Sequence, residues 1–348
     1  MVLQDVFEEM MQYEAYRAHK SILLYVPPFL VVIGSIGNLL SLVIMTRKPM
    51  RKLSTYNYLA VLAITDTLVL YIGLLRLWVG ALTGKEVHDH AVWICKLINV
   101  LGYTVSDYSV WLIIAMTVER WIAVCMPLKA PSMCNRRRAA LVIMGVLALL
   151  FAINLHFFWT TEIRHYRTSG SIQQQCDSGE SFEKLNKLVW PWVDAFIYSF
   201  FPFVVILSLN GLIIHNVVLS KKKRHGLTAG SGASWVNKNS AKPRNQRSSH
   251  SESSTKLTVM LLTISFTFLL TTLPMNVLLI VKAFITQGTA PMRIAAKMTL
   301  ARTITELLMY FNHSMNFFLY CATGEKFRQQ LLLLVCRGRA QTNPNVRW

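Results

Sequence analysis

Seven long stretches of this chain are apolar and nearly free of charged side chains. Three contain no Asp, Glu, Lys or Arg, namely residues 21–46, 139–161 and 257–281. Four others hold one acid each, namely residues 53–75 with Asp66, 97–118 with Asp107, 188–220 with Asp194 and 303–324 with Glu306. A helix of about 20 such residues crosses the ~30 Å hydrocarbon core of a bilayer. The pattern predicts an all-α membrane protein built as a seven-transmembrane helix bundle.

Composition supports the membrane class. Of the 348 residues, 53% are hydrophobic and 15% are charged, whereas soluble domains carry about 25% charged residues. The formal net charge of +19 would suggest a nucleic-acid partner for a soluble protein. In a membrane protein the distribution of that charge indicates topology instead, so we expect no nucleic-acid partner.

The charged residues divide unequally between the two sides of the predicted bundle. With the N-terminus placed outside, the cytoplasmic segments hold 22 Lys and Arg against two acids, and the outer segments hold 11 against ten. Lys and Arg accumulate in loops that stay in the cytoplasm. We therefore expect a multi-pass protein of the plasma membrane, with its N-terminus outside, its C-terminus in the cytoplasm and basic inner faces that meet membrane lipid.

These stretches divide the chain into three parts. We expect residues 1–20 to form an extracellular arm without a signal peptide, and residues 21–324 to form the transmembrane domain. Within that domain, the Gly-, Ser- and Asn-rich residues 221–255 are predicted to be a disordered third inner loop. Residues 325–348 are predicted to form an amphipathic eighth helix on the inner leaflet and a cytoplasmic tail.

Two possible modification sites follow on the inner side. Cys336 lies near the end of the eighth helix and is either palmitoylated or simply reduced. A serine cluster in the third inner loop is either phosphorylated or part of an unmodified linker. Its members are Ser248, Ser249, Ser251, Ser253 and Ser254.

Cysteine placement follows the same topology. Cys95 and Cys176 lie on the outer side, where disulfides persist, and the other four cysteines lie in or near the reducing side. A single outer pair suggests one disulfide, and two free thiols are the alternative.

An ordered set of residues resembles the rhodopsin-like G protein-coupled receptors across roughly residues 21–335. The set runs in the order and at the membrane depth of that family. It consists of Gly37-Asn38, Leu62 to Asp66, Cys95, Glu119-Arg120-Trp121, Cys176, Pro202, Phe268 with Pro274, and Asn316 with Tyr320. The segment NHSMNFFLYCATGEKFR is similar to invertebrate FMRFamide-type and related neuropeptide receptors.

Four positions depart from the family pattern. Phe317 stands where the seventh helix has proline, Thr272 where the sixth has tryptophan, and Asn210 where the fifth has tyrosine. The fourth stretch lacks its tryptophan. These changes affect the residues that switch the receptor rather than those that define its fold.

The resemblance implies a signalling mechanism. A ligand bound outside would favour one of two helix arrangements, and the kink at Pro274 would let the inner half of the sixth helix swing away from Arg120. Glu119 holding Arg120 would favour the closed state, although the pair could instead only set helix depth. Heterotrimeric G protein, arrestin and a receptor kinase are the implied cytosolic partners.

The resemblance also implies an allosteric sodium ion in the transmembrane core, and no other cofactor. The expected ligands are Asp66, Ser109, Asn312 and Asn316, while His313 stands where the family often has serine. An intramembrane carboxylate needs compensation, which the ion would supply.

Single residues argue against amine and retinal ligands and favour a peptide. Gly102 occupies the place of the acid of amine receptors, and the seventh stretch has no lysine for a retinal Schiff base. A charged pocket mouth formed by Arg76, Arg302 and Glu306, with Tyr103 opposite, favours a peptide. These residues could also pair only with one another or with lipid headgroups.

We expect Glu306 to pair with Arg302 or Arg76 until a peptide guanidinium replaces that partner. For the deeper acids Asp107 and Asp194, a buried structural role has at least equal weight.

Other classes were weighed against this interpretation. A receptor of the same fold for a non-peptide or unidentified ligand is one alternative, and a transporter or channel using the intramembrane acids is a weaker one. No inverted repeat supports the transporter. No metal-ligand spacing, nucleophile elbow or phosphate loop indicates an enzyme.

Overall fold

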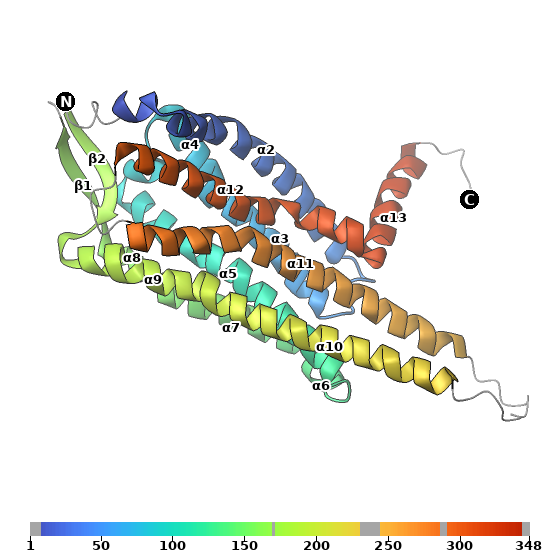
Figure 1. Ribbon diagram of the computed structural model, residues 1–348. Helices are drawn as coiled ribbons and strands as arrows, with labels where there is room; N and C mark the ends of the chain where they lie inside the picture. Colours follow the sequence, from blue (N-terminus) through green and yellow to red (C-terminus); the bar gives the residue numbers. More distant parts are fainter. Residues whose placement is uncertain (1–7, 169–170, 230–243, 286–290, 343–348) are drawn as a thin grey trace, which may run out of the picture.

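Seven long helical stretches lie side by side in the computed structural model, which describes residues 8–168, 171–229, 244–285 and 291–342 (Figure 1). They are α2 (Glu14–Met45), α3 with α4 (Thr55–Val69 and Arg76–Thr83), α5 (Val92–Cys125), α7 (Arg136–Asn154), α9 with α10 (Trp190–Ala195 and Phe201–Ala229), α11 (Arg244–Ile285) and α12 (Met292–Thr323). The π-helical turns Leu70–Leu75 and Phe196–Phe200 join α3 to α4 and α9 to α10. Shorter helices are α6 (Ala130–Met133), α8 (Phe157–Thr160) and α13 (Glu325–Thr342).

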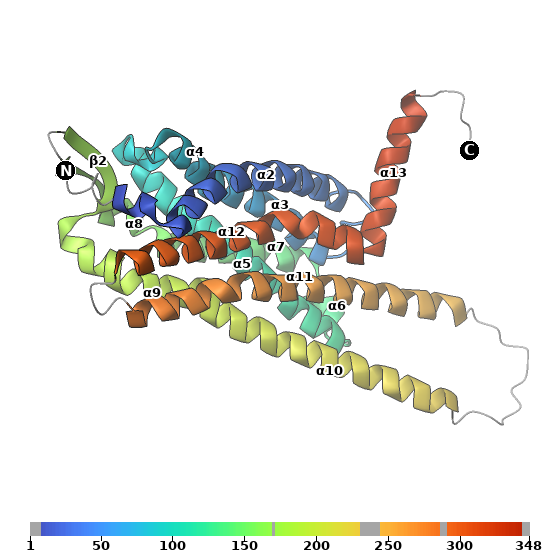
Figure 2. The ribbon, with the colours of Figure 1, turned by 45° about the horizontal axis from the view of Figure 1, so that its top comes forward.

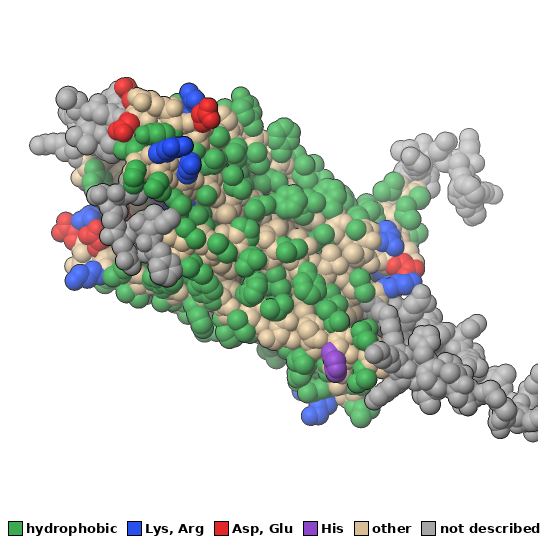
Figure 3. Space-filling view, in the orientation of Figure 1, with side chains coloured by type: hydrophobic (Ala, Val, Ile, Leu, Met, Phe, Trp, Pro, Cys, Tyr) green, Lys and Arg blue, Asp and Glu red, His purple; other side chains and the backbone are tan. Residues whose placement is uncertain are grey.

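The outside of the bundle is apolar between two charged ends. Figure 3 shows hydrophobic side chains covering the visible face, with Lys, Arg, Asp and Glu gathered toward the ends. Among the described residues, six of the helical stretches are long and apolar enough to cross a membrane. Exposed apolar side chains such as Phe29, Leu141 and Val204 suit a lipid environment and not water.

Helix α12 completes the bundle although it is less apolar than the other six stretches. Its polar side chains face inward, because Asn312, His313, Ser314 and Asn316 are all buried. The helix packs between α2 and α11 (Figure 2). Buried polar groups require partners, so α12 is held by neighbours that supply them rather than by apolar character alone.

Helices α2 and α12 approach closely at Gly37. A Cβ atom added at this glycine would lie 2.9 Å from Cβ of Phe317, which is closer than side chains pack. Phe317 occupies the position that departs from the family proline, and its ring packs against Phe318 and Phe327. The small residue on α2 therefore makes room for the large residue on α12.

A β-hairpin lies over one end of the bundle, where the sequence predicted only a polar loop. Strands β1 (Thr161–Thr168) and β2 (Ser171–Ser178) are antiparallel, with Ile163 opposite Cys176. The sequence signal was weak, because both faces of the segment are largely polar and a Ser-Gly pair between the two runs is the main indication. We call this the hairpin end, and the opposite end the Arg120 end.

The predicted disulfide is present at the hairpin end. Cys95, near the start of α5, is bonded to Cys176 of β2 with a Cα–Cα distance of 5.6 Å. The backbone N–H of Cys176 also donates to Asp89 at 2.7 Å. The hairpin is thereby fixed to the top of α5.

Helix boundaries differ from the predicted parts of the chain. Helix α2 begins at Glu14, so the predicted arm 1–20 contributes its last residues to the first helix. Within the segment 221–255, which was predicted to be a disordered loop, the described residues are helical, since α10 continues to Ala229 and α11 begins at Arg244. The side chains of the predicted serine cluster lie outside the described residues.

Helix α13 follows Gly324 and turns away from the bundle axis (Figures 1 and 2). Phe327 is fully buried against Tyr320 and Phe317, and Lys256 of α11 pairs with Glu325 at 2.7 Å. Cys336 is exposed. The amphipathic pattern thus anchors the start of α13 to the bundle.

Replacing both Cys95 and Cys176 with serine should lower the free energy of unfolding by about 2–4 kcal/mol, because the disulfide closes a loop of 81 residues. The measurement is the thermal unfolding midpoint of the purified protein. The matched control is Cys125→Ser, which removes a free cysteine and should change the midpoint little. Equal midpoints for the double variant and wild type would contradict the expectation.

Candidate functional site

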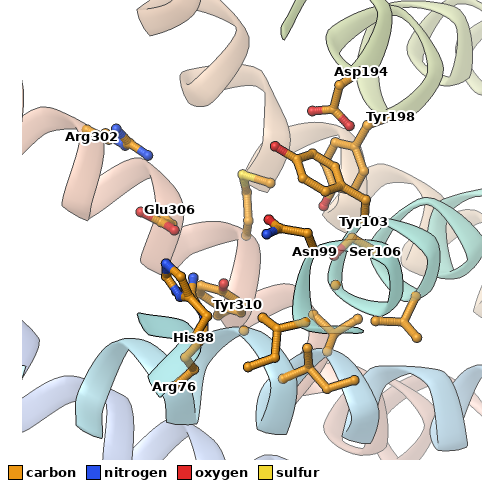
Figure 4. A pocket seen from close by; sticks show the side chains of 17 residues that line it. Arg76, His88, Asn99, Tyr103, Ser106, Asp194, Tyr198, Arg302, Glu306 and Tyr310 are labelled. Carbon is orange, nitrogen blue, oxygen red and sulfur yellow. The ribbon is translucent and has the colours of Figure 1, made fainter. Parts of the chain in front are cut away.

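A cavity of about 330 Å³ opens toward the hairpin end between α3, α4, α5, α9 and α12 (Figure 4). Its apolar lining includes Val69, Ile72, Ile98, Val105 and Met309. Its polar and charged lining consists of Arg76, His88, Asn99, Tyr103, Ser106, Asp194, Tyr198, Arg302, Glu306 and Tyr310. The structure therefore brings together all four residues predicted to bind the ligand, namely Arg76, Tyr103, Arg302 and Glu306.

One wall of the cavity carries most of the charge. Figure 4 shows Arg302, Glu306, Arg76 and His88 on the same side. The expected pairing of Glu306 is wrong in this structure. Arg76 pairs instead with Glu86 of the following loop at 2.9 Å, and Glu306 makes no ion pair or hydrogen bond with another described residue. The loop acid is partly exposed, so pairing Arg76 with it costs less desolvation than pairing two groups deeper in the bundle.

The loop after α4 completes the partners of Arg76. Its Nη1 donates to Nδ1 of His88 at 2.8 Å, and Nε2 of His88 lies 3.5 Å from Asp89. Because arginine can only donate, Nδ1 must accept, and the imidazole is neutral with its proton on Nε2. Burial, and then the charge of Arg76, lower the pKa of His88, in keeping with this tautomer. Arg76 is thus held to the mouth of the cavity.

The opposite wall is aromatic and carries a second acid. Tyr103 stacks on Phe157 with ring centroids 4.6 Å apart and meets Trp190 edge-on. Asp194 lies on the same side as Tyr103 and Tyr198 in Figure 4 and has no hydrogen-bond or ion-pair partner in the described part of the chain. From the sequence, a structural role had at least equal weight for this residue. Its position eight residues before Pro202, about 12 Å along a helix toward the outside, was the available signal.

Asp107 has the structural role that was considered for it. Its side chain is buried outside the cavity lining, and Oδ2 accepts from the Asn154 side chain of α7 at 2.9 Å. Asn154 also donates to the carbonyl of Leu150 at 3.0 Å. The pair joins α5 to α7 below the cavity.

The transmembrane core holds Asp66 among donors from two other helices. Ser109 donates to Oδ1 at 2.8 Å, and the Asn316 amide donates to Oδ2 at 2.7 Å. His313 Nδ1 is also 2.8 Å from Oδ1. Asn312, the fourth expected member of this cluster, makes no hydrogen bond to Asp66.

Arg120 and Glu119 lie at the Arg120 end with two hydroxyl groups. Oε1 of Glu119 accepts from Ser54 and Thr55 at 2.7 Å each, and Arg120 donates to the Thr55 hydroxyl. The Arg120–Glu119 separation is 3.7 Å. Thr55 therefore bridges the two charged groups and ties them to the start of α3, a link that the sequence analysis did not predict.

The positions that depart from the family pattern are in place but differently used. Thr272 bonds the carbonyl of Phe268 in its own helix at 2.8 Å. The Asn210 side chain and the Tyr320 hydroxyl are buried without hydrogen-bond partners in the described structure.

The bundle, the disulfide and this ordered set of residues are those of a seven-helix membrane receptor. The family model "7 transmembrane receptor (rhodopsin family)" matches residues 37–320, and the chain belongs to that family. The predicted fold and the resemblance are thus confirmed.

Three receptors illustrate the proteins to which the chain is similar. The Drosophila melanogaster FMRFamide receptor is 26% identical over 319 residues, covering 88% of this chain and 52% of its own length. Growth hormone secretagogue receptor type 1 of Oryctolagus cuniculus is 26% identical, covering 88% and 78%. Thyrotropin-releasing hormone receptor of Ovis aries is 25% identical, covering 85% and 73%. The chain therefore spans about half the length of the fly receptor.

Asn154→Ala should lower the free energy of unfolding by about 1–3 kcal/mol, because it leaves the buried carboxyl of Asp107 without its partner. Asp107→Leu should cost less, since Asn154 keeps its bond to Leu150. Thermal unfolding of the purified variants checks the order. Asn216→Ala is the matched control, because Asn216 is only half-buried and its side chain bonds the carbonyl of Leu212 in its own helix. The reverse order would contradict the pairing.

Proposed function

We propose that this chain is a neuropeptide receptor of the plasma membrane, with its N-terminus outside, and that it activates a heterotrimeric G protein without catalysing a reaction. The observation that carries the proposal is the cavity at the hairpin end with two carboxylates, Glu306 and Asp194, that lack partners among the described residues. Unpaired acids in a largely buried pocket are costly unless a ligand compensates them. The excess of cytoplasmic Lys and Arg supports the orientation.

A cationic, amidated peptide end fits this cavity chemically. Its volume lies at the lower end of the ~300–1,000 Å³ of ligand pockets, so it takes the end of a peptide and not the whole of one. A guanidinium offers two parallel N–H donors to a carboxylate, and a C-terminal amide adds no negative charge. The aromatic wall of Tyr103, Phe157 and Trp190 suits a phenylalanine ring. The name of the fly FMRFamide receptor agrees with such a ligand.

At the other end, the cluster of Glu119, Arg120 and Thr55 supports coupling to G protein. The three groups hold α5 to α3. Opening this end requires the inner half of the sixth helix, α11, to move away from them. Pro274 lies inside α11 and provides the bend about which its inner half moves. Arrestin and a receptor kinase are proposed to use the same inner surface, and α13 is proposed to rest on membrane lipid.

Glu306→Gln should weaken a peptide ending in Arg-Phe-amide by about 1.5–3 kcal/mol, which is roughly 10–150-fold in Kd. The loss arises because the guanidinium loses its charged acceptor. The same peptide with citrulline in place of arginine should lose little further affinity on this variant. Competition binding on membranes from cells expressing each variant measures both losses.

Asp194→Asn is the matched control, since it neutralises the other carboxylate of the cavity. On that variant the citrulline substitution should still cost its full amount. If citrulline is tolerated on Asp194→Asn and not on Glu306→Gln, then Asp194 binds the arginine. If the losses add on both variants, neither acid is its partner.

Arg120→Ala should abolish second-messenger production while ligand binding and surface expression stay near those of wild type. The reason is that the helix of the G protein that enters the opened inner end loses its main contact with the receptor. Arg138→Ala, which removes an exposed arginine at the same end, should signal normally. Full output from Arg120→Ala would exclude Arg120 from G-protein coupling.

A further inference from the structure

The buried acid at the centre of the bundle has three hydrogen-bond donors on its two oxygens. Asp66 is fully buried, and its oxygens contact the Ser109 hydroxyl, the Asn316 amide nitrogen and Nδ1 of His313 at 2.7–2.8 Å. A carboxylate offers about four acceptor sites. Three are therefore used by groups of this chain, and two of those groups present nitrogen.

A sodium ion requires the opposite chemistry at this position. Hard cations are held by oxygen atoms of carboxylates, carbonyls and water, and an N–H directed at the ion's place repels it. Asn312 makes no bond to Asp66, and Asn316 turns its nitrogen toward the acid. The residues present at Asp66 therefore do not fit the sodium ion that the family resemblance implies.

His313 is also fixed in place by its neighbours. Its backbone carbonyl accepts from the Asn38 side chain at 3.2 Å, and the next residue, Ser314, donates to the carbonyl of Leu30 at 3.1 Å. Both partners belong to α2. The imidazole itself is 2% exposed and lies 3.4 Å from the Ser109 hydroxyl. The backbone of α12 is thus fixed against α2 at His313, and the imidazole is buried beside Asp66.

Two of the expected sodium ligands, Asn312 and Asn316, each keep a buried Oδ1 without a hydrogen-bond partner among the described residues. Such groups in protein interiors are satisfied by ordered water where a site is polar. They leave room for water beside the cluster, but the acid itself, which an ion needs as its counter-charge, is already bonded.

We infer that the imidazole of His313 occupies the place of the sodium ion on Asp66, so that the transmembrane core of this receptor is closed by its own side chain and is indifferent to sodium. The replacement compensates the carboxylate from within the chain. Serine in place of His313 would remove the nitrogen donor and return an oxygen ligand to the cluster.

The test uses the purified full chain without peptide, so it does not depend on the proposed ligand. The thermal unfolding midpoint is compared in sodium chloride and in N-methylglucamine chloride at equal ionic strength. Wild type should unfold at the same midpoint in both salts. His313→Ser should show a saturable rise of ~2–4 °C in sodium, because the ion binds the folded state only. Adding Asp66→Asn to that variant should abolish the rise.

Two results would overturn the inference. One is a saturable, sodium-specific rise in wild type that Asp66→Asn removes. The other is the absence of any sodium effect in His313→Ser, because something other than the imidazole would then exclude the ion. If His313→Ser does not fold, ²²Na⁺ binding to wild type, with Asp66→Asn as the blank, decides the question. Bound ion above the blank rejects the inference, and binding equal to the blank supports it.

Discussion

The structure depends on how the fully buried carboxylate of Asp66 is compensated inside the bundle. Asp66 lies on α3, and its donors come from α5 and α12. An ionised group in a bilayer is tolerated only when it is paired and hydrogen-bonded, so these three helices must stay together. The position of α12 follows from this requirement, since its buried polar residues would find no partner facing lipid. The positions of α2 and α11, which pack against α12, are then set by the position of α12.

The cavity and the inner cluster lie on opposite sides of this polar centre. Above it, the disulfide and the Asp89 contact hold the hairpin over α5, and the charged and aromatic walls face each other across the cavity. Below it, Thr55 joins Glu119 to Arg120. Helix α5 carries residues of all three regions, Tyr103 in the cavity, Ser109 in the centre and Arg120 below. A shift of α5 relative to α3 would therefore be felt at both ends.

The sequence predicted the membrane-spanning helices, whose apolar surface faces lipid, and those single residues whose type and position have one usual role. Apolar length predicted the helices, the two cysteines on one side predicted the disulfide, and the charged mouth predicted four residues that line the cavity. The coupling role of Arg120 stays a prediction. The sequence did not predict which acid pairs with Arg76. Several acids are within its reach, and only three-dimensional packing selects Glu86. Nor did the sequence predict the hairpin, whose strands have no buried face to impose a clear alternation. His313 was recognised as unusual from the sequence. Only the distance between its Nδ1 and the Asp66 carboxylate shows that the two side chains are hydrogen-bonded.

Phe317 has a mechanical consequence. Proline at this position would remove a backbone N–H and weaken the helix there, whereas phenylalanine keeps the hydrogen-bond ladder of α12 whole from Met292 to Thr323. Helix α12 is therefore continuous and stiff, and it packs closely against α2 at Gly37. Helix α11 has the proline that α12 lacks, at Pro274. The proline inside α11 gives that helix a place to bend, whereas α12 has no proline and moves, if it moves, as a rigid body.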